Sequence, residues 1–224
     1  MRDRVKNHVH VDNDGGISWI TSKGKLVPFK TSQVWEDLRP NLAIVPWHQV
    51  VWFPQANPKH AFIMWLVICG RLTTQDKLGK WYPNKCFSCV LCGKEEDSIK
   101  HLFFACEYSK KVWLEIKNYL IFRGLPSNIH DIVHTLAGFP LRNQIWDVIN
   151  RISIAATVYH IWQERNCRIF KGGRRPEKEI VQCIVDGIRM KLSTLFVKNS
   201  SAIRMAAKKW GMDLDAGRLK MKNG

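Results

Sequence analysis

The first part of the chain has the pattern of short strands, and a helical pattern follows it. Two runs rich in β-branched and aromatic residues, ISWI at 17–20 and LVPF at 26–29, flank the turn sequence SKGK. The proline in the second run suits an edge strand. Thr31 or Ser32 can cap the next helix, whose apolar residues recur on one face. The pattern therefore predicts a small β-hairpin and one helix, followed by a linker that contains prolines.

Helical spacing of apolar residues dominates the rest of the chain. Between Lys59 and Cys69 the residues are apolar almost all round, as in a buried helix. Thr73 can cap a short helix that runs to Leu78. Further helices are predicted after Ser109 as a cap, from Ile129 to Leu136, from about Asn143 to Phe170, and from Pro176 to Leu195. The residues after Lys198 are basic and weakly patterned. The predicted fold class is mainly α, with a short β-hairpin lead-in and a C-terminal helical extension.

Length and composition allow a substantial buried core. The chain has 224 residues, of which 46% are apolar and ten are tryptophan, so we do not expect general disorder. It has no run of about 18 apolar residues, which excludes a membrane span, and its first residues lack the apolar segment of a secretory signal. We therefore expect an intracellular protein that is not secreted. In a reducing compartment, bunched cysteines favour a metal site over disulfide bonds.

The charge is strongly positive and unevenly distributed. There are 35 Lys and Arg against 19 Asp and Glu, a formal net charge of +16. Residues 171–224 alone hold 13 basic and 5 acidic residues. This asymmetry indicates a polyanionic partner, with nucleic acid as the first choice and an acidic membrane as the second. The alternative is a basic surface with no dedicated partner.

Three cysteines and a histidine have the spacing of a zinc site, Cys89-x2-Cys92-x8-His101-x4-Cys106. A Cys-x-x-Cys pair lets two thiolates reach one ion across a tight turn, for which Gly93 provides backbone freedom. Ser98 can cap a short helix that carries His101. Three thiolates and one imidazole fill all four positions of a tetrahedral zinc ion. We therefore predict a structural site rather than a catalytic one, because catalysis needs an open position for water.

Cys86 leaves a second ligand set open. It makes another ligand-like pair with Cys89, so a set of Cys86, Cys89, Cys92 and Cys106 without His101 is an alternative. That set crowds three thiolates into seven residues, and we expect Cys86 to be a spectator. A chance cluster of buried thiols is the other alternative. The remaining cysteines lie in apolar helical stretches and are expected to be small core residues: Cys69, Cys167 and Cys183.

Several motifs in fixed order carry a resemblance to a known family. PKHAFIMWLVICGRLTTQDKL is followed by CVLCGKEEDSIKHLFFAC and then by Val112-Trp113, with the lead-in W-x-x-S-x-G-x-x-x-x-F upstream and IWQERNCRIFKG downstream. This composite resembles the zinc-binding domain that lies beyond the reverse transcriptase of plant LINE-type (non-LTR) retrotransposons. The resemblance implies a nucleic-acid-binding accessory module with zinc on Cys89, Cys92, His101 and Cys106. It also supports leaving Cys86 out of the site.

We expect four regions: a lead-in over 1–46, the zinc-binding domain over 47–122, a helical extension over 123–198 and a basic tail over 199–224. No paired-aspartate polymerase motif, endonuclease region or RNase H carboxylate set is visible, so the sequence predicts no enzyme. In this interpretation the chain is a fragment or a domesticated copy, and a polymerase partner is encoded elsewhere. Such a protein is expected in the nucleus, or otherwise in the cytoplasm.

Cations and aromatic side chains near the zinc segment and after the long helix are the candidate nucleic-acid contacts. They are Arg71, Lys77, Lys80, Trp81, Tyr82, Lys85, Lys94, Lys100, Lys110, Lys111, Lys171, Arg174, Arg175 and Lys178. Lys and Arg neutralise phosphates, and Trp81 and Tyr82 can stack on unpaired bases. The alternative function is a zinc-stabilised protein-interaction or structural module, for which the tryptophan-rich helical half would supply the surface.

Overall fold

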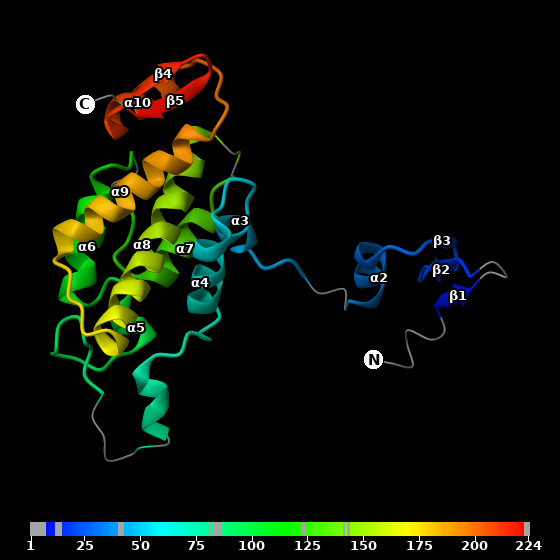
Figure 1. The fold of residues 1–224 in the computed structure, drawn as a ribbon, viewed down its shortest axis with the longest axis horizontal. Coiled ribbons are helices and arrows are strands. Elements are labelled where there is room, and N and C mark those ends of the chain that lie inside the picture. Colours follow the sequence, from blue (N-terminus) through cyan, green and yellow to red (C-terminus); the bar gives the residue numbers. More distant parts are fainter. Residues whose placement is uncertain are drawn as a thin grey trace. The chain divides into compact units, whose positions relative to one another are not determined.

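The computed structural model of the protein describes residues 8–11, 15–39, 43–80, 82, 87–121, 124–140, 142 and 144–221. The chain divides into two units, residues 1–44 and 45–224, and each is described by itself (Figure 1). The fold is mainly α, as predicted. None of the helices in the described ranges combines the length and the hydropathy that crossing a membrane requires.

The first unit is a three-stranded antiparallel sheet followed by one helix. Its strands β1 (Val9–Val11), β2 (Ile17–Ile20) and β3 (Leu26–Pro28) lie in that order, and α2 (Thr31–Leu38) follows. Trp19 is fully buried and donates its indole N–H to Asp37 Oδ2 at 2.7 Å, which ties the helix to the sheet. The predicted hairpin and helix are confirmed. The predicted caps are wrong, because Thr31 and Ser32 already lie inside the helix and Lys30 occupies the N-cap without a side-chain hydrogen bond.

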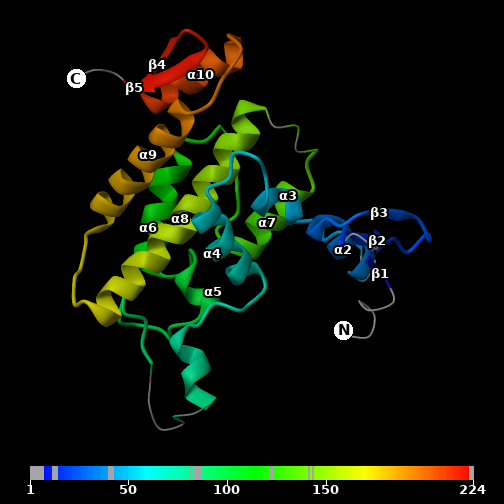
Figure 2. The same ribbon diagram turned by 45° about the vertical axis from the view of Figure 1, so that its right-hand side comes forward.

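The second unit is a helical assembly around one long helix. Its elements are α3 (His48–Val51), α4 (Pro58–Ile68), the 3-10 helix η1 (Gln75–Lys80), α5 (Ile99–Leu102), α6 (Glu107–Lys117), α7 (Ile129–Ala137), α8 (Ile145–Phe170), α9 (Glu177–Ser193), α10 (Ser201–Trp210), β4 (Met212–Asp215) and β5 (Arg218–Met221). Helix α8 contacts α3, α4, α6, α9 and α10. Both views show it between α9 and α4 (Figures 1 and 2).

The middle of α8 is buried on every side because neighbouring helices surround it. Ile154, Val158 and Ile161 are fully buried, and so are the polar residues Ser153 and Thr157. Thr157 Oγ1 donates to the Ser153 carbonyl oxygen at 2.7 Å, which satisfies the hydroxyl inside the helix. Small side chains at these positions let the neighbouring helices approach closely. The predicted helix from about Asn143 to Phe170 is therefore the central element of the core.

Residues 201–221 contain structure that the sequence pattern did not predict. Ser200 is the N-cap of helix α10, and its side chain accepts from the backbone N–H of Ile203. Gly211 is the C-cap, in the left-handed region with a φ of 61°. Strands β4 and β5 follow as an antiparallel hairpin. Trp210 is fully buried with its ring centroid 5.0 Å from that of Tyr119. The predicted region boundaries themselves stay predictions.

Two further helix caps differ from the prediction. Thr73 does not begin a helix; the backbone N–H of Gln75, at the start of η1, donates to Asp97 Oδ2 at 2.9 Å. Ser109 lies in the first turn of α6, and Cys106 occupies the N-cap. Helix α4 is also exposed on one face instead of buried all round, with Phe62 half exposed.

His60 on α4 and His160 on α8 should make the stability of the protein sensitive to acid. The rings of His60 and Tyr159 lie 4.4 Å apart and those of His60 and His160 lie 5.9 Å apart. Burial lowers the pKa of both His60 and His160 to about 4. The unfolded chain therefore binds more protons than the folded protein between about pH 6.5 and 4, so stability falls as the pH falls through this window.

In the wild type, each of the two histidines should reduce the free energy of unfolding by roughly 1 kcal/mol for each pH unit of acidification, after screening by solvent. The double variant His60→Gln/His160→Gln should lose this dependence on pH. Urea unfolding at pH 7, 6 and 5 measures it. Both proteins keep the same cysteine cluster, so the difference between them isolates the two rings. His130→Gln, at an exposed position, is the matched control. Parallel pH profiles for the wild type and the double variant would contradict the prediction.

Candidate metal centre

The first two cysteines lie on a tight turn that its own backbone closes. We call residues 87–106 the metal loop. The backbone N–H of Cys89 donates to the Glu95 carbonyl oxygen at 2.6 Å, and that of Asp97 donates to the Phe87 carbonyl oxygen at 2.9 Å. Gly93 has a φ of 70°, and its N–H donates to the Cys89 carbonyl oxygen at 2.7 Å. A side chain at Gly93 would strain this turn, so glycine is needed there.

The histidine and the last cysteine follow on a short helix and on the turn after it. Ser98 caps α5 by accepting from the backbone N–H of His101 at 3.2 Å, as predicted. The helix ends at Leu102, and Phe104 has a positive φ of 79°. Ser109 Oγ accepts from the Phe104 N–H at 3.1 Å and donates to the Cys106 carbonyl oxygen at 3.2 Å. Ser109 therefore holds the turn that brings Cys106 back toward His101.

The four predicted ligand atoms come together in a geometry that fits zinc. The Sγ atoms of Cys89, Cys92 and Cys106 and a ring nitrogen of His101 all lie within 4.8 Å of one another. Cys89 Sγ and Cys106 Sγ are 3.9 Å apart, and thiolates bound to one tetrahedral zinc ion are separated by about 3.8 Å. Cys92 Sγ lies 3.2 Å from His101 Nε2. Because all four donors are protein side chains, the site suits a structural zinc ion.

Burial and charge at the cluster favour a bound cation. Cys89, Cys106 and His101 are buried and Cys92 is half-buried. The contact between the Cys89 and Cys106 sulfurs lowers the pKa of Cys89 and raises that of Cys106. Buried thiolates need neutralising charge, and zinc provides it to all of them. Glu95 Oε2 lies 3.1 Å from His101 Nδ1, but it is not aligned as a hydrogen bond.

The C-terminal end of α8 holds the metal loop from outside. Arg165 forms a buried ion pair with Asp97. Asp97 is fully buried and lies between Cys92 and His101 in the sequence. Arg168 donates through Nη1 to the carbonyl oxygens of Val90 at 3.3 Å and Leu91 at 3.1 Å, inside the Cys89–Cys92 turn. These contacts join residues 68 to 78 positions apart. The metal centre therefore depends on a helix far away in the chain.

A second buried acid keeps these arginines in place. Glu164 is fully buried and accepts from Arg168 Nε at 2.8 Å and from Arg175 Nε at 2.9 Å. Burial raises the pKa of Glu164, but the hydrogen bonds from the two guanidinium groups outweigh it and lower the pKa overall. The sequence pattern did not predict this network. Its only local signal is the helical spacing of Glu164 and Arg168 on α8.

Residues 29–113 match the family model described as zinc-binding in reverse transcriptase. This part of the chain is therefore similar to the zinc-binding region of reverse transcriptases. The match contains all four candidate ligands and ends inside α6, so the α8 residues that hold the metal loop lie beyond it. The comparisons with curated proteins and with solved structures gave no match. A LINE-type and plant origin of the zinc-binding region stays a prediction.

The other cysteines are less buried than predicted. Cys69 is exposed, because it follows the last turn of α4 on the open face of that helix, and Cys167 and Cys183 are half-buried. The expectation of small core residues is therefore wrong for Cys69. Cys86 lies outside the described residues, so the alternative ligand set that includes it stays open. The side chains of Phe103 and Phe104 are buried, and Phe104 stacks on Trp113 with centroids 4.8 Å apart.

Several predicted nucleic-acid contacts already bind groups within the protein. Lys77 Nζ donates to the Gly70 and Leu72 carbonyl oxygens, both at 2.6 Å. The other members of this group form ion pairs: Lys94 with Glu107, Lys111 with Glu177, and Arg175 with Glu164. Trp81, Lys85 and the side chain of Lys80 lie outside the described part of the structure, and Tyr82 is 59% exposed.

The remaining predicted cations are exposed, and most of them lie around α6 and the start of α9. They are Arg71, Lys100, Lys110, Lys171, Arg174 and Lys178. Tyr108 on α6 donates its hydroxyl to the Arg175 carbonyl oxygen at 2.9 Å, joining segments 67 residues apart. The connection between α8 and α9 therefore lies against α6. We call Lys110, Lys171, Arg174 and Lys178 the basic surface.

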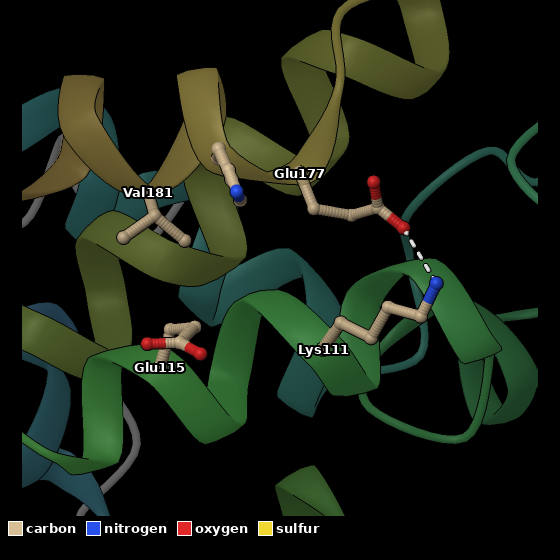
Figure 3. Close-up of a pocket in the computed structure, with 5 residues that line it drawn as sticks. Lys111, Glu115, Glu177 and Val181 are labelled. Carbon is tan, nitrogen blue, oxygen red and sulfur yellow. Dashed lines mark hydrogen bonds and ion pairs between the residues drawn. The ribbon is translucent and has the colours of Figure 1, made fainter.

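A pocket of about 490 Å³ between α6 and α9 adjoins this surface. Lys111, Glu115, Glu177, Lys178 and Val181 line it. Figure 3 shows the Lys111–Glu177 ion pair, 3.1 Å long, that connects the two helices there. Two lysines and two glutamates balance each other in charge, so the pocket itself does not concentrate positive charge.

Proposed function

We propose that the protein is a non-catalytic, zinc-stabilised nucleic-acid-binding module that accompanies the reverse transcriptase of a LINE-type retrotransposon. The observation that carries the proposal is the meeting of two basic segments beside the metal loop, through the contact of Tyr108 with Arg175. Phosphates bind to such clusters of exposed Lys and Arg. The zinc ion would hold the loop on which this arrangement depends.

The ligand set supports a role of the zinc ion without catalysis. Three sulfurs and one ring nitrogen complete a tetrahedral coordination sphere, which leaves zinc no position for a reacting water. The protein would therefore hold RNA or DNA for a polymerase encoded elsewhere. A nuclear location, or otherwise a cytoplasmic one, is part of the same proposal.

Salt dependence tests the proposal. Binding of a fluorescein-labelled 20-nucleotide RNA and of the same DNA sequence should weaken steeply between 50 and 300 mM salt. Each lost contact should reduce the slope of log affinity against log salt by about 0.7 for a single strand. Lys171→Gln/Arg174→Gln should therefore reduce the slope by about 1.4 and weaken binding several-fold at low salt. Fluorescence anisotropy measures both quantities.

The matched control is Lys23→Gln/Lys25→Gln, which makes the same charge change in the first unit. Equal slopes for the two variants would remove the basic surface from the proposal. Absence of binding at 50 mM salt would contradict nucleic-acid binding altogether. That result would favour a protein-interaction module, although Trp113 and Trp210 of the tryptophan-rich half are buried in the core and form no docking surface.

A further inference from the structure

Helix α4 has one face that the described protein leaves open. Its buried face consists of Ala61, Met64 and Val67, which pack on the core. Phe62 lies opposite with Lys59 beside it, and Trp65 lies at the edge of this face, half-buried against the core. Phe62 is 50% exposed. In both views α4 lies on the other side of α8 from α9 (Figures 1 and 2). Phe62 and the exposed part of Trp65 therefore form an aromatic patch at the surface of an ordered helix.

The end of α4 places a guanidinium group beside these rings. Gly70 has a φ of 64°, its N–H donates to the Val67 carbonyl oxygen, and the N–H of Arg71 donates to the Leu66 carbonyl oxygen at 2.8 Å. This pair of bonds is a Schellman motif, which turns the chain sharply back. As a result Arg71 Cζ lies 5.8 Å from the centroid of the Trp65 ring. The motif therefore fixes Arg71 next to Trp65.

The rings of Phe62 and Trp65 lie next to each other on the helix surface. Their centroids are 5.8 Å apart and their planes are inclined by 36°. They are not stacked face to face, so the protein does not use one ring to cover the other. An aromatic face with a cation beside it is the arrangement on which single-stranded nucleic acids stack their bases.

The charge around these rings favours an anionic occupant. Lys59 and Arg71 are exposed, and Lys77 is fixed nearby by the carbonyl oxygens of Gly70 and Leu72. Helix α4 contains no Asp or Glu. The closest acid in the following segment, Asp76, accepts a hydrogen bond from the backbone N–H of Lys77. Positive groups without acidic neighbours on α4 complement a phosphate backbone.

We propose that Phe62, Trp65 and Arg71, with Lys59, form a stacking platform for the bases of single-stranded RNA or DNA. The inference rests on the proposed function and names a binding site that is separate from the basic surface. The rings bind bases, and Lys59 and Arg71 neutralise the flanking phosphates. A duplex hides its base faces, so the platform should discriminate single strands from double strands.

Phe62 provides the sharpest test because half of its surface is exposed and its removal should cost little stability. Phe62→Ala should weaken binding of fluorescein-labelled oligo(U)20 about tenfold, the lower part of the range for one stacked base. Binding of a 20-base-pair RNA duplex and the salt slope should not change, because no phosphate contact is lost. Phe62→Tyr keeps the ring and should restore wild-type affinity. Phe196→Ala removes another exposed Phe with an arginine over its ring and is the matched control.

The outcomes separate this inference from the proposed function. Steeply salt-dependent binding by the wild type, with Phe62→Ala indistinguishable from it, would overturn the platform and leave the proposed function standing. Equal losses for Phe62→Ala and Phe196→Ala, or for single strand and duplex, would also overturn it. Phe62→Ala could also leave oligonucleotide binding unchanged but alter the molecular mass of the protein in light scattering. That result would make this face a protein interface and would overturn the platform. Absence of binding by the wild type would overturn both proposals.

Discussion

Cys92→Ser is expected to abolish zinc binding and to unfold the metal loop. A serine hydroxyl is a poor zinc ligand, and the remaining two sulfurs and imidazole cannot complete the coordination sphere. Zinc in small structural sites contributes about 10 kcal/mol or more to folding. The metal loop has little else that holds its first turn, apart from backbone hydrogen bonds and the contacts with α8. Cys92→Ser should therefore destabilise the protein more than any other single substitution proposed for it.

Zinc content per chain and hydrogen exchange over residues 87–106 measure this result. Cys69→Ser is the matched control, because Cys69 is exposed and distant in sequence from the cluster. We also expect Cys86→Ser to retain the ion. Equal loss of zinc in Cys86→Ser and Cys92→Ser would mean that the ligand set is different from the one proposed. A folded, zinc-free wild-type protein would remove the structural role of the ion.

Asp97→Asn is expected to cost about 3–5 kcal/mol of unfolding free energy, the range for breaking a buried ion pair. Asp97 is fully buried and pairs with Arg165, whose side chain is also buried. The asparagine oxygen can still accept from the backbone N–H of Gln75, so the start of η1 keeps its hydrogen bond. What is lost is the negative charge that compensates the guanidinium group of Arg165. An unpaired buried charge is far more costly than an absent pair.

Urea unfolding in excess zinc measures the change in free energy. The double variant Asp97→Asn/Arg165→Met should recover much of the loss, because it removes the uncompensated charge as well. Asp213→Asn, at an exposed position of β4, is the matched control and should change stability by less than about 0.5 kcal/mol. A loss below 1 kcal/mol for Asp97→Asn, or simple additivity in the double variant, would show that the pair does not hold the metal loop. Faster zinc release to a chelator should accompany the loss.

Helices with a strong local pattern were predictable from the sequence. Helix α7 has Asn128 as a capping residue and four buried apolar residues at helical spacing, so its identity depends on local chemistry alone. The caps of some other helices were not predictable from the sequence. Cys106 takes the N-cap of α6 without a side-chain hydrogen bond, and Ser109, the predicted cap, instead holds the turn at Phe104.

The candidate nucleic-acid contacts were also only partly predictable from the sequence. Fourteen contact residues were predicted from charge and aromatic character, but sequence could not separate exposed cations from paired ones. Lys77 and Arg175 look like any other basic residue in the sequence, yet their partners are carbonyl oxygens of a nearby turn and a buried carboxylate. Phe62 was expected inside a buried helix, because the apolar run hides which face meets the core.

The sequence by itself predicted the four candidate zinc ligands and determined the excess of positive charge. Spacing within 18 residues decides whether donor atoms can reach one ion, and charge depends only on composition. Tertiary structure alone decided that Arg165 and Arg168 hold the metal loop, that α10 and a hairpin complete the second unit, and that α4 keeps an open aromatic face. These features depend on contacts between segments far apart in the chain, and no local pattern of residues encodes which distant segment will be the neighbour.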